Sequence, residues 1–274
     1  MTIHPTAIIA PGANVHPSVE VGPYVVIGPH VTIGANCRIG AHCHLEGWTT
    51  LGSDNVLCPH VTLGCPPQDL KYDGKPSYIV IGKGNCFREF VTVHLAEGEG
   101  NTTTIGDGNM FMNFSHIAHN CHVGSHCIFA NAATLAGHVH VGDRAVLGGF
   151  VGVHQFCHVG GYVMIGGMSK ITKDVPPFVK IDGNPARVIG LNGIGLKRNG
   201  VPRESIERIR QVYRLFYRSS LNVRQALAEL ETRPEMADPF VQDFVAFVKA
   251  SKRGIYKRTR MSGSAERGGD AGDL

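Results

Sequence analysis

Histidine is concentrated in three short segments of the chain, and their spacing suggests that the imidazoles meet. The segments are NFSHIAHNCHVG (113–124), LAGHVHVG (135–142) and VHQFCHVG (153–160), and they hold seven of the 15 His residues. A neutral imidazole can take up a proton near pH 7, and a group of imidazoles can also hold a divalent metal ion. The segments therefore predict either general-base catalysis or a metal centre.

The element that must position these imidazoles is a repeat of six residues. Of the 29 positions taken every sixth residue from 3 to 171, 26 are apolar, and the exceptions are Asp69, Lys75 and Glu99. The residue two places before each aliphatic is usually small or short, as at Ala7, and Gly often follows the aliphatic, as at Gly22. Such a unit cannot bury its apolar side chain alone, so successive units must stack.

Three units make one triangular coil, and coils stack ~4.8 Å apart through parallel β pairing. Gly is expected to supply both unusual backbone angles and close approach at the corners. The repeat therefore predicts an all-β fold, a parallel β-helix with a triangular cross-section. Its handedness does not follow from the pattern, and the general crossover rule favours right-handed connections.

Residues 18 apart occupy the same position on successive coils, which defines the expected site. His119, Gly137 and Gln155 stack on one corner. The flanking residues His116, His138 and His154 should join them within about two coil rises, or ~10 Å. The same arithmetic stacks His122, His140 and His158 in one ladder and pairs His42 with His60, and these five are interpreted as solvated or intersubunit side chains.

Two segments, 66–78 and 95–104, break the repeat and are expected to leave the prism as loops. Beyond Arg203 the apolar spacing becomes helical. The expected organisation is a β-helix over 1–190, a helical domain over 191–260 and a disordered tail over 261–274.

Residues 197–260 carry 15 Lys and Arg against 7 Asp and Glu, a net charge of +8, which leaves −4 on the rest of the chain. This basic region predicts an acidic partner, an anionic ligand or a membrane surface.

The hydrophobic pattern, the Cys residues and the aromatic residues indicate where the protein is located and which partners it can bind. No apolar run approaches the ~18 residues of a membrane span, and the N-terminus lacks the pattern of a signal peptide. Eight Cys without a secretory signal are expected to be reduced thiols, so a cytoplasmic location is expected. Five of them fall at the small interior position, and Cys58, Cys65 and Cys86 do not. Aromatic residues are not interleaved with the basic ones as stacking on nucleic acid requires, so no nucleic-acid partner is expected.

Two other kinds of protein compete with a metal-free enzyme. Zinc-binding β-helical carbonic anhydrases also take His from neighbouring coils, although the spacing here, H-x2-H-x2-H followed by H-x-H, is no defined zinc signature. A non-catalytic β-helical binding module is the second alternative. Elemental analysis distinguishes the first, and the effect of replacing one His on activity distinguishes the second.

Several stretches resemble one enzyme family, the UDP-N-acetylglucosamine acyltransferases that begin lipid A synthesis. They are QDLKYDG (68–74), HIAHNC (116–121), NAATLAGHV (131–139), VHQFC (153–157), DVPPFV (174–179), GNPARVIGLN (183–192) and GLKRNG (195–200). The resemblance implies a left-handed coil, a homotrimer, no cofactor, and transfer of a (3-hydroxy)acyl group from acyl carrier protein to the 3-hydroxyl of UDP-N-acetylglucosamine.

The resemblance also assigns roles to residues. His119 resembles the general base, and the Gly137 N–H resembles the oxyanion donor. The contacts to sugar and acyl group correspond to Asp69, Lys71, His116, Asn120, His138, His154 and Gln155. Asn192 and Arg198 resemble the groups that hold the nucleotide diphosphate, and the basic helices would receive the carrier protein.

The chain departs from the family pattern at a few positions. Many members have Asp where this chain has Asn120, and relatives read VTIHRGT where it has VTVHLAEG. Asn199 replaces an Arg seen in relatives. Gly167 corresponds, by the resemblance, to the family's acyl-length ruler, and a bare Gly there favours a longer acyl chain.

Overall fold

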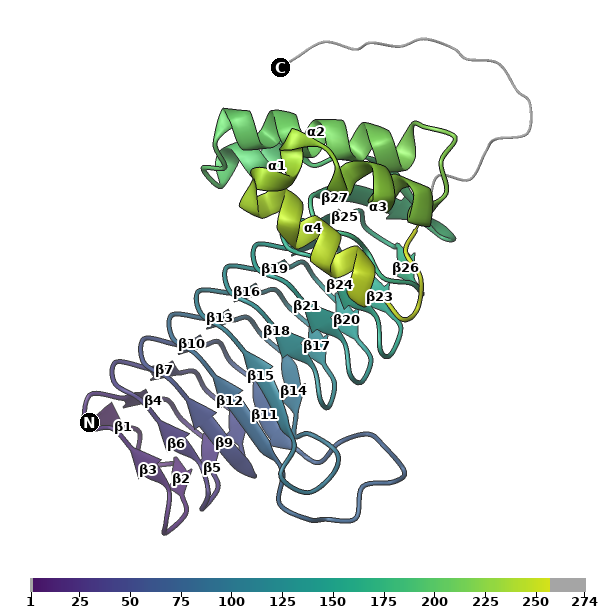
Figure 1. Ribbon diagram of the computed structural model, residues 1–274. Helices are drawn as coiled ribbons and strands as arrows, with labels where there is room; N and C mark the ends of the chain where they lie inside the picture. Colours follow the sequence, from purple (N-terminus) through teal and green to yellow (C-terminus); the bar gives the residue numbers. More distant parts are fainter. Residues whose placement is uncertain (1, 257–274) are drawn as a thin grey trace.

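The computed structural model describes residues 2–256, which form a prism of short strands with helices at its C-terminal end (Figure 1). The expected tail, 261–274, lies outside the described residues. The strands form three sheets, one for each face of the prism, and nearly all pair in parallel. The expected triangular parallel β-helix is confirmed.

Each sheet takes every third strand of the repeat. Sheet A contains β1 (Thr2–Ile3), β4 (Glu20–Val21), β7 (Arg38–Ile39), β10 (Val56–Leu57), β13 (Cys86–Phe87), β16 (Met110–Phe111), β19 (Ile128–Phe129), β22 (Val146–Leu147), β25 (Met164–Ile165), β27 (Val179–Gly183) and β28 (Ala186–Leu191). Sheet B contains β2 (Ile8–Ile9), β5 (Val26–Ile27), β8 (His44–Leu45), β11 (Thr62–Cys65), β14 (Thr92–His94), β17 (His116–Ile117), β20 (Thr134–Leu135), β23 (Gly152–Val153) and β26 (Lys170–Ile171). Sheet C contains β3 (Asn14–Val15), β6 (Thr32–Ile33), β9 (Trp48–Leu51), β12 (Tyr78–Ile81), β15 (Thr102–Ile105), β18 (His122–Val123), β21 (His140–Val141) and β24 (His158–Val159).

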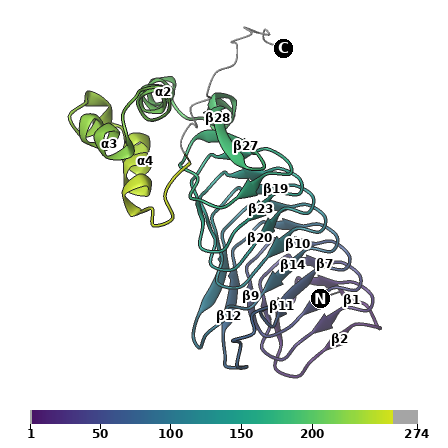
Figure 2. The same ribbon diagram turned by 90° about the vertical axis from the view of Figure 1, so that its right-hand side faces the viewer.

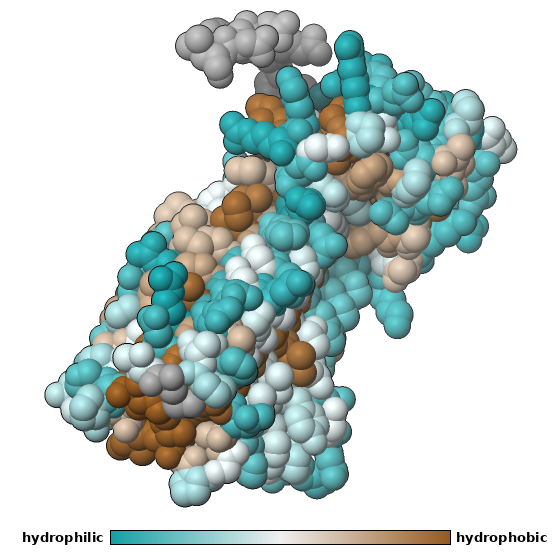
Figure 3. Space-filling view, turned by 90° about the vertical axis from the view of Figure 1, so that its left-hand side faces the viewer, coloured by the Kyte–Doolittle hydropathy of each residue, from teal (hydrophilic) through white to brown (hydrophobic). Residues whose placement is uncertain are grey.

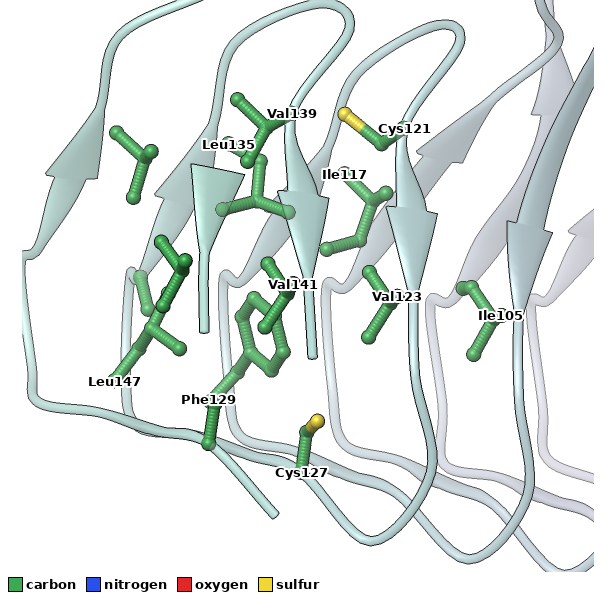
Figure 4. Close-up of a cluster of buried hydrophobic side chains, with 14 of the residues drawn as sticks. Ile105, Ile117, Cys121, Val123, Cys127, Phe129, Leu135, Val139, Val141 and Leu147 are labelled. Carbon is green, nitrogen blue, oxygen red and sulfur yellow. The ribbon is translucent and has the colours of Figure 1, made fainter. Parts of the chain in front are cut away.

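The interior of the prism is built from the predicted columns. From Val21 to Ile171, every apolar member of the six-residue column is at most 4% exposed. Figure 4 shows such side chains from successive coils pointing into one shared interior, with Cys121 and Cys127 among them. The five Cys predicted to be interior are buried, and Cys58, Cys65 and Cys86 are partly exposed. Burial of these stacked aliphatics holds each coil on the next.

The expected role of Gly at the corners is only half right. The left-handed backbone position recurs at six-residue intervals, and Gly occupies it at Gly12, Gly84 and Gly108, but most of its occupants are other residues, such as Asn36 and His138. The Gly that follows an aliphatic is needed for close approach instead. A Cβ on Gly34, for example, would lie 2.8 Å from the backbone of Gly52 on the next coil.

Both expected excursions occur between sheets B and C, where the chain leaves the prism after Cys65 and again after His94. The three expected helices are α2 (Arg203–Tyr217), α3 (Val223–Glu231) and α4 (Pro239–Ala250). The structure adds α1 (Gly193–Arg198), a 3-10 turn over Pro234–Ala237 and the antiparallel strand β28. The helices gather on one side of the upper prism (Figure 2). None of the helices within residues 2–256 is long and apolar enough to cross a membrane.

The two ends of the prism differ. The helices cover its C-terminal part, whereas Ile3 and Ile8 of the first coil are 39% and 64% exposed. Brown, apolar side chains gather at that end in Figure 3. The first coil has no preceding coil on which to pack, so its apolar residues stay partly uncovered.

The predicted ladder of imidazoles is present on sheet C. The ring centroids of His122 and His140 lie 4.5 Å apart, as do those of His140 and His158. A cleft of about 570 Å³ lies between this ladder and α4. Burial, followed by the neighbouring His158 and His122, lowers the pKa of His140 from 6.5 to about 4. His140, in the middle of the ladder, is therefore a neutral ring at pH 7.

The ladder predicts a loss of stability in acid. Because the pKa of His140 is depressed by folding, the unfolded chain binds more protons below pH 6.5. The melting temperature should hold above pH 6.5 and fall as the pH drops towards about 4. The facing carboxyl group, Asp243 on α4, has a pKa raised by burial, which reduces the negative charge it can offer a protonated ring at low pH. In the variant His140→Gln, the melting temperature should fall less between pH 6.5 and about 4 than it does in the wild type. If the variant shows the same pH dependence as the wild type, the His ladder is not the source of the acid sensitivity.

Candidate active site

A pocket of about 630 Å³ opens at the corner between sheets B and C, beneath the first excursion loop. The loop contributes Gln68, Asp69, Leu70 and Lys71, and successive coils contribute His116, Ala118, His119, Thr134, Leu135, Ala136, Gly137 and Gln155. Six predicted site residues therefore meet here, namely Asp69, Lys71, His116, His119, Gly137 and Gln155. Although His119 lies at a corner of the prism, it is only 9% exposed, because the first excursion loop covers it.

One side of the His119 ring is fixed by Asn120 and the second excursion. The Asn120 Oδ1 lies 2.8 Å from His119 Nδ1 and also accepts the Glu97 N–H at 2.8 Å. The Asn120 Nδ2 donates to the Glu97 carbonyl at 3.0 Å. These two backbone partners allow only one orientation of the amide, so His119 Nδ1 must carry the proton it donates. In the neutral ring, the lone pair is then on Nε2.

The other side of the ring faces the pocket. His119 Nε2 lies 3.8 Å from Asp69 Oδ2. The second oxygen of this carboxylate, Oδ1, accepts the Lys71 N–H at 2.9 Å and so fixes the turn of the loop. The separation of 3.8 Å exceeds a hydrogen bond but is short enough for the carboxylate to attract a protonated imidazole.

Gly137 packs directly against the same nitrogen. A Cβ on Gly137 would lie 2.4 Å from both Cε1 and Nε2 of His119, so no other residue fits there without moving the ring. Among the described residues, no acceptor is hydrogen-bonded to the Gly137 N–H. A free backbone donor therefore lies on the coil adjacent to the unprotonated Nε2.

The imidazoles around His119 remain neutral at neutral pH. Burial, and then the charges of His94 and His119, lower the pKa of His116 to about 4. Burial likewise lowers the pKa values of His94 and His138, with His119 as the second cause in each case. The surroundings of His119 thus do not form a cluster of cations.

The remaining predicted residues lie around or beyond the pocket. His138 meets the His119 ring edge to face, with ring centroids 5.2 Å apart. Asn120 orients the His119 ring. Neither His138 nor Asn120 lines the cavity. His154 is exposed and lies 3.4 Å from Arg253 through its Nδ1. Gly167 lies on the corner between sheets A and B, where it stacks on Gly149. Asn192 and Arg198 lie at α1, away from this pocket.

Several residues that support the site were not among those predicted from the sequence. The Glu97 backbone, which holds Asn120, belongs to a loop without periodicity. Thr92 Oγ1 lies 2.7 Å from His116 Nδ1. The two residues are in register on adjacent strands of sheet B, a pairing that could have been found by counting coils around the excursion. Within residues 2–256, no three His, Cys, Asp or Glu side chains are arranged to hold a metal ion.

Two family models match the chain. The one described as "Udp N-acetylglucosamine O-acyltransferase; Domain 2" matches residues 174–256. The one described as "Bacterial transferase hexapeptide (six repeats)" matches residues 1–35, 30–65 and 102–137.

Curated relatives and solved structures agree with these models. A relative from Verminephrobacter eiseniae is 50% identical over 259 residues, covering 93% of this chain and 99% of the relative. One from Anaeromyxobacter is 45% identical over 256 residues, with the same coverage. Both are named acyl-[acyl-carrier-protein]--UDP-N-acetylglucosamine O-acyltransferase.

Among solved structures, the UDP-N-acetylglucosamine acyltransferase of Francisella novicida has a TM-score of 0.91 at 32% identity, covering 97% of this chain and all of that one. The enzyme of Bacteroides fragilis has a TM-score of 0.89 at 38% identity, covering 93% of this chain and 99% of that one.

Proposed function

This chain belongs to the family of UDP-N-acetylglucosamine O-acyltransferases, and we propose that it transfers a (3-hydroxy)acyl group from acyl carrier protein to the 3-hydroxyl of UDP-N-acetylglucosamine. This reaction is the first step of lipid A biosynthesis. The fold is the left-handed parallel β-helix that the resemblance implied. The observation that carries the proposal is the pairing of an oriented, unprotonated His119 Nε2 with the free N–H of Gly137.

The arrangement suits acyl transfer between a thioester and a hydroxyl group. His119 Nε2 takes the proton of the sugar 3-hydroxyl as the oxygen attacks the thioester carbonyl. The Gly137 N–H donates to the oxyanion that forms, and Asp69 attracts the imidazolium. When the C–S bond breaks, the departing thiolate takes the proton back from His119. A positioned base is worth about 10²–10⁴ in rate, and one oxyanion donor about 10²–10³.

The remaining site residues are assigned to binding. Lys71 on the exposed loop, His116 and Gln155 would contact the sugar or the acyl group within the pocket. His138 and His154 lie on the next two coils and would extend these contacts. Asn192 and Arg198 would hold the diphosphate, for which the forked guanidinium is well suited.

We also propose that the enzyme is a homotrimer. The outer side of sheet A carries a continuous apolar stripe of Val56, Cys86, Met110, Ile128, Val146 and Met164, each in register with the next. Such a stripe is typical of a surface covered by another subunit. Sedimentation of an active monomer would contradict this assembly.

We further propose residues 1–190 as the catalytic domain and 191–260 as the helical domain that receives the acidic carrier protein. A cytoplasmic location is supported by the eight free thiols. The proposed reaction needs no cofactor, so chelators should leave the activity unchanged, whereas dependence on zinc would favour a hydratase-like chemistry.

The test of the function is a transfer assay with purified protein, UDP-N-acetylglucosamine and a panel of acyl carrier protein thioesters. The expected product is a monoester of the UDP-sugar, detected by mass spectrometry. Its absence with every donor would contradict the proposal.

A column of stacked residues without side chains on two coils predicts how donor length is selected. Asn131, Gly149 and Gly167 stack, so two successive coils present no side chain there. A Cβ on Gly167 would lie 3.3 Å from the Gly149 carbonyl oxygen, and Gly167 does not need a positive φ, so a longer side chain fits with a small shift. If the acyl chain lies along this column, Gly167→Met should obstruct it and remove about 0.8 kcal/mol of burial for each displaced methylene.

Donor preference should therefore move towards shorter chains by at least about tenfold, with unchanged UDP-sugar affinity. Gly161→Met is the matched control, since Gly161 has the same position in the repeat but lies on another corner. If Gly167→Met keeps the donor profile of the wild type, the acyl chain does not follow this column.

A further inference from the structure

Helix α1 is fastened to the prism by a polar contact at each end. At its start, Asn192 Nδ2 donates to the carbonyl of Tyr162 at 2.8 Å. At its end, Asn199 Oδ1 accepts from Arg144 Nη1 at 2.9 Å. The Arg144 guanidinium carbon also lies 5.9 Å from the centroid of the Tyr162 ring. These residues form one cluster, and Arg144 comes from the corner between sheets C and A.

Two guanidinium groups at this end of α1 are not neutralised by a carboxylate: Arg144 of the cluster and Arg198, the residue before Asn199. Among the described residues, neither of them forms an ion pair. The neighbouring carboxylate, Asp143, instead accepts the Ser125 N–H at 2.8 Å. A guanidinium has five N–H donors, and only one of those on Arg144 is hydrogen-bonded to another described residue. Its remaining donors are therefore available to an anion.

The partner of Arg144 is also informative. Asn199 is neutral, and its Nδ2 is occupied by the Gly195 carbonyl, so its Oδ1 faces Arg144 as an acceptor. This contact restrains the long Arg144 side chain without consuming its charge. A restrained guanidinium loses less entropy when it binds a phosphate group.

We propose that Arg144 binds the diphosphate of the nucleotide sugar together with Arg198, so that the anion subsite is built from a prism corner and the end of α1. The inference rests on the proposed function, which supplies the ligand. It explains how the chain provides a second guanidinium although Asn199 stands where relatives have Arg. The charge comes from a residue that is adjacent in space but 55 positions away in sequence.

The position of Arg144 also indicates how the ligand is shared. Arg144 and the His119 pocket lie on opposite edges of sheet C, separated by a strand segment of roughly 16 Å at about 3.3 Å per residue. The 3-hydroxyl and the diphosphate of a nucleotide sugar are separated by one sugar ring only. Arg144 would therefore serve the pocket of a neighbouring subunit in the proposed trimer.

The alternative role for Arg144 is purely structural, as a pin for α1, and two variants separate the roles. Arg144→Gln removes the charge but keeps an amide able to donate to Asn199. Asn199→Ala removes the acceptor but keeps the guanidinium. The affinity of the full-length protein for UDP is measured by calorimetry at several salt concentrations, with KM for the UDP-sugar and for the acyl donor in parallel.

Arg144→Gln should weaken UDP binding by about tenfold or more, as expected for a lost charge-assisted contact, and should reduce the salt dependence of that affinity. Asn199→Ala should change UDP affinity by less than about threefold, because the guanidinium remains. The double change Arg144→Gln with Asn199→Arg should restore much of the affinity. KM for the acyl donor should not change in any of them.

Equal losses of UDP affinity in Arg144→Gln and Asn199→Ala would overturn the inference and assign Arg144 to structure alone. Unchanged UDP affinity in Arg144→Gln would overturn the inference too. In that case, transfer activity of the wild-type protein would still support the proposed function. Conversely, UDP binding that depends on Arg144 in a protein without transferase activity would support the subsite and contradict the proposed function.

Discussion

Replacing His119 with Ala should reduce kcat by about 10²–10⁴ or more, because it removes the imidazole whose Nδ1 is fixed by Asn120 and whose Nε2 lies beside Gly137 in the pocket. The Asn120 amide fixes the proton on Nδ1, and the neighbouring His116 cannot substitute as an equivalent base, since its pKa is lowered to about 4. The loss should appear in kcat, with UDP-sugar affinity little changed, because other groups bind the nucleotide.

The prism should survive this substitution. His119 lies at a corner, outside the columns of aliphatic side chains that hold the coils together. Circular dichroism and sedimentation should match the wild type. His158→Ala is the matched control, since it removes an imidazole from sheet C outside the pocket and should leave kcat within about threefold of the wild type. Near-wild-type turnover in His119→Ala would remove His119 from its role as base.

Replacing Gly137 with Ala should reduce kcat by about 10²–10³, because the substitution keeps the backbone N–H but misaligns it with the displaced His119 ring. The added methyl group would lie 2.4 Å from His119 Nε2, well inside van der Waals contact, so the ring or the backbone must move. The backbone of Gly137 does not have a positive φ, so the effect would come from this contact and not from backbone strain. One methyl group would therefore disturb both the base and the donor.

Gly161→Ala provides the control for this prediction. Gly161 has the same position in the repeat, and its Cβ would lie 3.1 Å from the Asp143 carbonyl, with no catalytic group nearby. This variant should keep kcat within about threefold of the wild type. If Gly137→Ala is equally active, the pocket tolerates displacement of His119 and the assigned geometry is wrong.

The sequence predicts the fold well because each coil of the β-helix is specified by a short repeat of neighbouring residues. One aliphatic every six residues determines which side chains face inward, and residues 18 apart must stack. This arithmetic by itself brings His119, Gly137 and Gln155 to one corner. It does not reveal the buried polar ladder of Asn55, Asn85 and Asn109, which replaces small interior residues and whose side chains hydrogen-bond to one another and to coil backbones.

The loops account for most of what could not be predicted. Loop 66–78 has no period, so its fold over His119 and the approach of Asp69 to Nε2 depend on a turn that the pattern does not encode. The hold of the Glu97 backbone on Asn120 has the same origin. The contact between Arg144 and Asn199 joins two parts of the chain with different periods, and only the folded structure brings them together.

The central claim is that this pocket acylates the 3-hydroxyl of a nucleotide sugar by metal-free base catalysis. The direct measurement is a transfer reaction by the chelator-treated wild-type protein, with UDP-N-acetylglucosamine and a 3-hydroxyacyl carrier protein thioester, followed by NMR of the product. The expected result is a single ester at the sugar 3-oxygen and release of one carrier thiol for each ester formed. No ester, an acyl group at another position, or activity that returns only when zinc is added would contradict it.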